Sequence, residues 1–169
     1  RQLQRTATGR RLLVFKPKFG LAAYLLVAAT DASISPLAVV RLMQFRTHGH
    51  HLQDKADQFR GDGRSSGCRC GSEREDPPHL FFACAATARQ RQAMVTALEQ
   101  ALAPIPGAIE GLRQLENDDA LGKWIWLNAL LDARNPAYRA ALPAVLKAVT
   151  EFIKQVLAVH PSTRGVGDS

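Results

Sequence analysis

The placement of the three cysteines constrains this chain most, because all of them lie between positions 68 and 84. A histidine lies inside the same span, so the segment reads Cys68-x-Cys70, then His79, then Cys84. Three thiolates and one imidazole are a common closed ligand set for structural zinc, which prefers four ligands in a tetrahedron. An odd, clustered cysteine count argues against a secreted disulfide framework and favours a reducing compartment. The spacing therefore predicts that these four residues bind one structural Zn2+.

The residues between these ligands favour a folded loop around the ion. Gly71 follows Cys70 and lets the chain fold back, so that backbone amides can approach the thiolates. Pro77 and Pro78 stiffen the approach to His79. A set of four protein ligands leaves no open position for water, so the predicted site is structural rather than catalytic. The alternative is that the three cysteines are unrelated free or buried thiols.

The remainder of the chain predicts helices, because no strand-like alternation of apolar and polar residues persists. Pro36, Asp119 and Asn135-Pro136 are typical of helix starts, and Pro104 ends a helix rich in Ala, Gln and Leu. Pro143 lies within the last expected helix and should bend or split it. Helices are expected over residues 19–30, 36–45, 52–59, 85–103, 108–115, 117–131 and 136–160. The predicted fold class is all-α, a small helical domain with an embedded structural zinc-binding (CCHC) module.

These signals divide the chain into three parts. Residues 1–18 form a basic N-terminal arm or linker, residues 19–160 a single helical domain that includes the zinc module at 61–92, and residues 161–169 a flexible tail. Residues 19–30 fit either a core helix or a targeting signal, and the clustered thiols favour the core helix. They are too short to span a membrane. Because the chain starts at Arg1, we expect a processed product or a piece of a longer protein.

Charge is distributed unevenly along the 169 residues, whose net charge is +7. Residues 1–91 hold 15 Lys and Arg against 7 Asp and Glu, whereas residues 92–169 hold 7 against 8. A basic half favours a polyanionic partner, RNA or DNA, although a solvated basic surface without a partner has the same composition. The arginines expected to contact nucleic acid are Arg46, Arg60, Arg64, Arg69, Arg74, Arg89 and Arg91.

The order of these motifs resembles the C-terminal segment of fungal non-LTR (LINE-type) retrotransposon proteins, downstream of their reverse transcriptase or ribonuclease H domain. The matching elements span roughly residues 36–92 and are Arg46-Thr47-His48-Gly49-His50, Cys68-Arg69-Cys70-Gly71, Glu75, and His79 to Cys84. The family's R-T-G-H is Arg46-Thr47-His48-Gly49 here, and its proline after the last cysteine is Ala85. The resemblance implies a module that grips template RNA or target DNA during primed reverse transcription, without catalysis of its own.

Other residues point away from catalysis. The chain has no phosphate-binding loop, and we find no nucleophile paired with a base and no convincing carboxylate pair, so an enzyme is not expected. The alternative function is a protein-interaction module, such as a domesticated virulence effector that binds a host protein through an apolar patch on its C-terminal helices. Accordingly, the expected location is nuclear or cytoplasmic, or else secreted and delivered into a host cell. A partner protein of the element or host is conceivable, and no oligomeric state is predicted.

Three sets of side chains allow both a structural and a functional interpretation. His48, His50 and His51 fit a polar turn better than a second metal site, because no cysteine or close carboxylate completes a ligand set. At least one of Phe81 and Phe82 should pack inside the protein rather than stack on a base. Trp124 and Trp126 lie in an apolar helix and should be core residues.

Overall fold

The computed structural model describes residues 23–47, 67–68, 70–73, 75–115, 118–133 and 135–159. Within these ranges every regular element is helical, so the predicted all-α class is confirmed. The helices are α2 (Ala23–Thr30), α3 (Pro36–Thr47), α5 (Pro77–Phe82), α6 (Ala88–Leu102), α7 (Ala108–Gln114), α8 (Ala120–Leu131) and α9 (Leu142–Val159), with 3-10 turns at Ala85–Thr87 and Pro136–Tyr138. The expected N-terminal arm, C-terminal tail and helix 52–59 lie outside the described residues.

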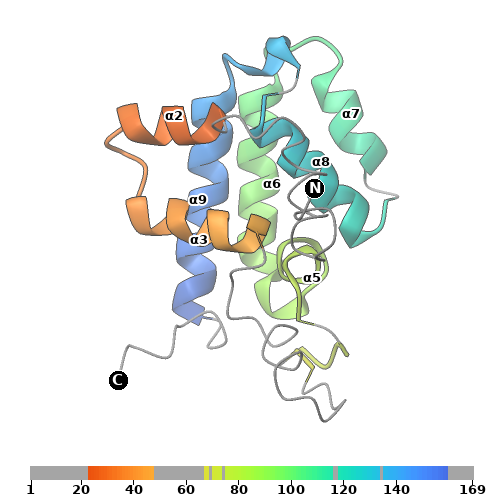
Figure 1. Ribbon diagram of the computed structural model, residues 1–169. Coiled ribbons are helices and arrows are strands. Elements are labelled where there is room, and N and C mark those ends of the chain that lie inside the picture. Colours follow the sequence, from red (N-terminus) through yellow and green to blue (C-terminus); the bar gives the residue numbers. More distant parts are fainter. Residues whose placement is uncertain are drawn as a thin grey trace, which may run out of the picture.

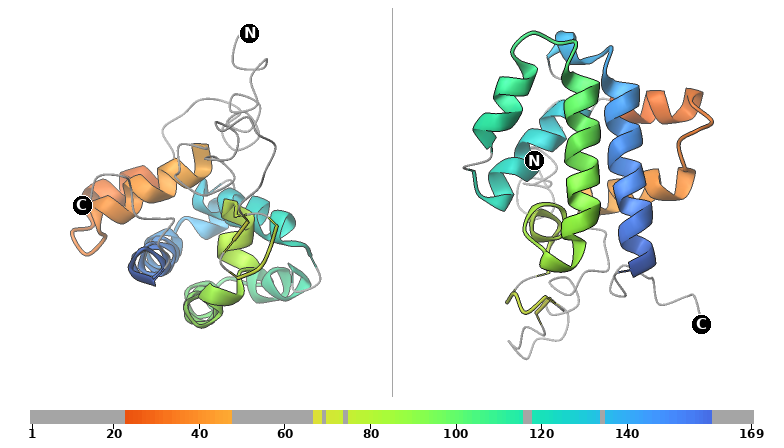
Figure 2. Two further views of the ribbon diagram at one scale, coloured as in Figure 1. Left: turned by 90° about the horizontal axis from the view of Figure 1, so that it is seen from below. Right: turned by 180° about the vertical axis from the view of Figure 1, so that it is seen from behind.

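Helices α6 and α9 run antiparallel, side by side, and form the axis of the domain (Figure 1). Helices α2 and α3 pack against α9, while α7 contacts α6 and α8 contacts both α5 and α9. Figure 2 shows α5 at the end of the domain where α6 begins, with the described part of the cysteine-containing loop beyond it. The candidate metal ligands therefore lie at one end of the helical domain.

Helix α9 supplies much of the core because its apolar residues recur every three or four positions, on one face. Those buried on this face are Val145, Leu146, Val149, Phe152, Ile153 and Val156. The expectation that Pro143 would bend or split the last helix is wrong, because α9 begins at Leu142 and Pro143 lies in its first turn. A first-turn residue has no intrahelical hydrogen bond to lose. Pro136 opens only a 3-10 turn rather than the helix itself.

Polar side chains cap the starts of α3 and α8. Asp119 is the N-cap of α8, and its carboxylate accepts a hydrogen bond of 2.7 Å from the backbone N–H of Gly122. Ser35 accepts a longer one, 3.4 Å, from the N–H of Ala38 at the start of α3. These side chains satisfy N–H groups that the first helical turn leaves unpaired.

Helix α2 belongs to the core, since Tyr24 is buried and the helix packs against α9. Residues 23–30 therefore form a helix of the core. Among the described residues, none of the helices combines the length and the apolar character needed to cross a bilayer.

The centre of the core is aromatic, and it is reached from the helix that carries the candidate ligand His79. Phe81, two residues later on α5, is fully buried, with its ring centroid 4.7 Å from that of Phe152 and 4.9 Å from that of Trp124. Phe45 of α3 meets the same ring edge-on at 5.7 Å. Contacts from three helices therefore fix α5, and with it the position of His79.

Candidate metal centre

The structure brings Cys68, Cys70, His79 and Cys84 together, with one potential ligand atom of each within 4.8 Å of all the others. The Sγ atoms of Cys68 and Cys84 are 3.7 Å apart, and Cys70 Sγ is 3.2 Å from His79 Nε2. Cys68 and Cys84 are buried, and the other two are partly buried. The cluster that the spacing predicts is therefore formed, and it can hold a metal ion.

These distances suit a tetrahedral ion. With metal–sulfur bonds of about 2.3 Å, two thiolates of a tetrahedron are about 3.8 Å apart. A thiolate and an imidazole nitrogen on the same ion are about 3.5 Å apart, for a metal–nitrogen bond of about 2.05 Å. The observed 3.7 and 3.2 Å lie close to these values, so small side-chain adjustments suffice to place four ligands around one ion.

A tight backbone turn presents the first two cysteines. Cys68 donates its N–H to Ser72 O at 2.7 Å, and Gly71 donates to Cys68 O at 2.9 Å. Gly67 and Gly71 have φ values of 63° and 90°, in the left-handed region that glycine tolerates. A Cβ atom at Gly67 would lie 2.7 Å from Ser72 O. The role predicted for Gly71 in reversing the chain is confirmed, and Gly67 serves the same turn from its other side.

The other two ligands are positioned by α5 and the turn that follows it. Asp76 caps α5 by accepting a hydrogen bond of 2.8 Å from the N–H of His79, and Pro77 occupies the first turn. Cys84 donates its N–H to His79 O at 2.7 Å, which closes the helix and brings the two side chains to one side. The five-residue separation of His79 and Cys84 therefore follows the end of helix α5 and is not an open loop.

Hydrogen bonds from Arg91 and Thr87 fix the position of Cys84 relative to α6. Arg91 Nη1 donates to Cys84 O at 2.9 Å, and Thr87 Oγ1 donates to the carbonyls of Leu80 and Cys84 at 2.9 and 3.2 Å. Thr87 is fully buried. These bonds satisfy carbonyls at the end of α5 and fix the ligand relative to α6.

Burial and hydrogen bonding affect the thiols differently when no ion is present. Desolvation by burial is the main cause that raises the pKa of Cys68 to about 12, and the neighbouring thiols add to it. At Cys70 desolvation also acts to raise the pKa, but backbone hydrogen bonds from Ser72 and Ala85 contribute to a net lowering. A buried thiol is costly to ionise without a cation nearby, whereas a bound metal ion deprotonates its ligands. The donor set thus fits a divalent ion.

Arg46 is not at a nucleic-acid surface, and the expectation that it contacts nucleic acid is wrong. It is 3% exposed, and its Nη2 lies 2.8 Å from Asp132 Oδ1. Its Nε donates to Asn128 Oδ1, and its guanidinium lies 4.7 Å from the centre of the Tyr24 ring. Helix α3 continues to Thr47, so Arg46 falls one turn after the buried Leu42, on the core face. A guanidinium enclosed in this way is unavailable to phosphate.

The remaining arginines fall into two groups. Arg89 is exposed on the first turn of α6, and Arg91 is half-buried on the next turn beside Cys84. Both therefore lie at the metal end of the domain. The other expected contacts, together with the histidine-rich turn at 48–51, lie outside the described residues; these arginines are Arg60, Arg64, Arg69 and Arg74.

The aromatic residues divide between the core and a surface pocket. Phe81 and Trp124 are buried, as predicted, whereas Phe82 and Trp126 are only partly buried and line a hollow between α6, α7 and α8. Lys123 lines the same hollow. Sequence reasoning missed this pocket, although the three-residue spacing of Lys123 and Trp126 on one helix places both on the same face.

Comparison of the chain with known proteins found no matching family model, no matching curated protein and no matching solved structure.

Proposed function

We propose that the chain is a nucleic-acid-binding helical domain whose Cys3His cluster holds one structural zinc ion. The observation that carries the proposal is that a complete four-ligand set forms within the half of the chain that holds 15 Lys and Arg against 7 Asp and Glu. Zinc is the metal that best suits three thiolates and one imidazole in a tetrahedron. The ion has four protein ligands and would order the surrounding basic segment rather than take part in catalysis.

The resemblance to the C-terminal segment of non-LTR retrotransposon proteins supports the same proposal. In that family the segment grips template RNA or target DNA, so the partner proposed here is RNA or DNA, bound mainly through phosphate contacts. Arg89 and Arg91 are the described members of the expected arginine set that stay near the cluster and reach the surface at least in part. Cations at such positions release condensed counterions when they neutralise phosphates, so binding should weaken steeply as salt rises.

The test is a titration of the zinc-loaded protein with RNA, single-stranded DNA and duplex DNA over a range of salt concentrations. Arg89→Ala should weaken binding and lower the salt dependence by about 0.7–0.9 in the slope of log K against log salt. Arg139→Ala is the matched control, because Arg139 is also exposed but precedes α9, which begins at the end of the domain where α6 finishes (Figure 1). Cys70→Ser should abolish both zinc binding and nucleic-acid binding. Undetectable binding to every nucleic acid at low salt would refute the proposal.

Exposed apolar side chains favour a second candidate, a protein-interaction module, although the residues that carry it lie on α2 and α3 and not on the C-terminal helices where the patch was expected. On α3 Leu37, Val40 and Met43 are 60, 49 and 38% exposed, and Leu26 of α2 is 56% exposed. Exposed neighbouring apolar side chains are typical of protein-binding surfaces. This candidate predicts that Leu37→Asp and Val40→Asp abolish capture of a stoichiometric protein partner while nucleic-acid affinity is unchanged or absent.

A further inference from the structure

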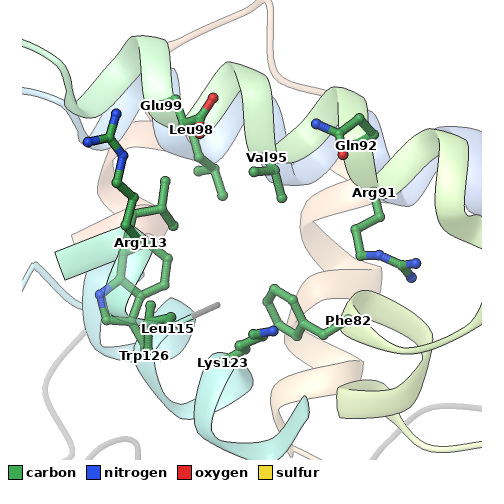
Figure 3. Close-up of a pocket in the computed structure, with 11 residues that line it drawn as sticks. Phe82, Arg91, Gln92, Val95, Leu98, Glu99, Arg113, Leu115, Lys123 and Trp126 are labelled. Atoms are coloured by element: carbon green, nitrogen blue, oxygen red, sulfur yellow. The ribbon is translucent and has the colours of Figure 1, made fainter. Parts of the chain in front are cut away.

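A pocket lies beside the metal centre, between α6, α7 and α8 and the end of α5. Figure 3 shows Val95 and Leu98 pointing from α6 into this hollow. The ring of Phe82 and the indole of Trp126 lie on opposite sides of it. Its inner surface is therefore apolar and partly aromatic. Leu98 is buried, whereas Phe82, Val95 and Trp126 are only partly buried.

The size of the pocket restricts what it can hold. Its volume is about 190 Å3. An apolar cavity of about 150 Å3 accepts a benzene molecule, whereas sites for drug-sized ligands occupy about 300–1,000 Å3. The hollow therefore accommodates one planar ring system or a comparable apolar group, with the rest of the ligand outside.

The charges around the opening indicate what such a ring would carry. Arg91, Arg113 and Lys123 line the pocket from three different helices, with Glu99 as the acidic residue among its lining. Figure 3 shows the three basic side chains distributed around the hollow rather than gathered on one side. An apolar ring bearing negative charge satisfies both features, since the ring fills the floor and the anion meets the cations.

We propose that this pocket binds one unpaired base of a single-stranded nucleic acid, with the adjoining phosphates held by Arg91, Arg113 and Lys123. The inference rests on the proposed nucleic-acid-binding function and specifies its partner as single-stranded. Aromatic faces accept any base by stacking, and cations follow the backbone, which is the combination that single-strand binders use. A base inside a duplex cannot enter, because its ring is stacked and paired.

The pocket is coupled to the metal centre through two of its walls. Phe82 ends α5, the helix that carries His79, and Arg91 donates its hydrogen bond to Cys84 O. Loss of the ion should weaken the contact between Arg91 and Cys84, while the core contacts of Phe81 continue to hold α5. Single-strand binding should consequently decrease on metal removal even where the basic surface remains.

The experiment compares single-stranded oligonucleotides with matched strands whose nucleotides lack bases, bound to the zinc-loaded full chain. Val95→Phe fills the pocket, and Leu121→Phe is the matched control, because Leu121 is 53% exposed on α8 and does not line the pocket. Val95→Phe should weaken binding of the intact strand by about 5- to 160-fold, the usual effect of losing one stacked base. Binding of the base-free strand should not change in either variant.

A second measurement does not depend on a pocket-filling substitution. Nucleoside monophosphates should quench the fluorescence of Trp126, assigned by its loss in Trp126→Phe, while ribose phosphate and inorganic phosphate should not. If Val95→Phe and wild type bind the intact strand equally and no quenching occurs, the pocket inference is wrong, and weaker binding by Arg89→Ala would then show that the domain binds nucleic acid elsewhere. Absence of any nucleic-acid binding refutes both proposals. An acidic peptide with one aromatic residue that competes for the pocket more strongly than the oligonucleotide would assign it to a protein partner instead.

Discussion

Replacing Arg46 by methionine removes a buried guanidinium and leaves a flexible apolar side chain in its place. Asp132, whose side chain is 10% exposed, then loses the Nη2 group 2.8 Å away, and the side-chain oxygen of Asn128 loses its Nε donor. Removing one partner of a buried ion pair costs about 3–5 kcal/mol, because the other charge stays buried without compensation. Residual solvent access at Asp132 favours the lower end, about 3 kcal/mol. For a chain of this size that corresponds to a fall in Tm of about 10 °C.

The assay is urea unfolding of the zinc-loaded protein for wild type, Arg46→Met, Asp132→Leu and the double variant. Since the two side chains are in contact, the double variant should lose less than the sum of the single losses, by about 2 kcal/mol. At a temperature where it remains folded, Arg46→Met should bind nucleic acid as wild type does. A loss under about 1 kcal/mol, with additive effects within about 0.5 kcal/mol, would refute the buried ion pair. A loss of nucleic-acid binding without a loss of stability would instead indicate that Arg46 contacts nucleic acid.

Three further predictions concern the metal turn and the helix caps. Gly67→Ala should weaken metal binding by about tenfold or more, because the new Cβ would lie 2.7 Å from Ser72 O. The control is Gly111→Ala, whose new Cβ would meet nothing within 4 Å and should stabilise α7 by about 0.5–1 kcal/mol. Asp119→Ala should lower the free energy of unfolding by about 1 kcal/mol in urea titrations, since α8 loses its cap. Metal affinity, measured by competition with a chelator, should rise with pH by roughly tenfold per unit for each thiol that must lose its proton, because burial raises the pKa of Cys68.

Each of these predictions has a contrary outcome. Equal metal affinity in the Gly67 and Gly111 variants would mean that the turn does not need its left-handed residue. Unchanged stability of Asp119→Ala would show that water or another group replaces the cap. A metal affinity that is independent of pH would mean that the thiols do not bind the ion as thiolates.

Features carried by neighbouring residues could be predicted from the sequence. The ligand cluster depends on donor chemistry within 17 positions, and Gly71 and Asp119 each bond to a backbone group three residues away. Most helices were found for the same reason, because apolar periodicity and capping are local. The error at Pro143 was one of boundary: the same proline that breaks a helix interior is tolerated in a first turn, and the local pattern did not show that α9 begins at Leu142.

Features assembled across the chain could not be predicted in this way. The partners of Arg46 lie 82 and 86 residues away, so no local pattern separates this arginine from Arg89, which stays exposed. The pocket likewise combines Phe82, Val95 and Trp126 from three helices. A count of charges alone places every arginine at the surface. Only the packing of α3 on its neighbours shows that Arg46 is buried in the core.

The central claim is that four residues bind one zinc ion at the end of a helical domain. Native mass spectrometry of the full chain tests this claim most directly. The account predicts one zinc per chain at neutral pH, and its loss in Cys70→Ser. It also predicts that a chelator removes the ion with local unfolding of the turn that carries Cys68 and Cys70, because binding free energy at such a site is folding free energy. The account would be contradicted if the metal-free wild-type chain kept its full stability, or if the Cys70→Ser variant retained the ion.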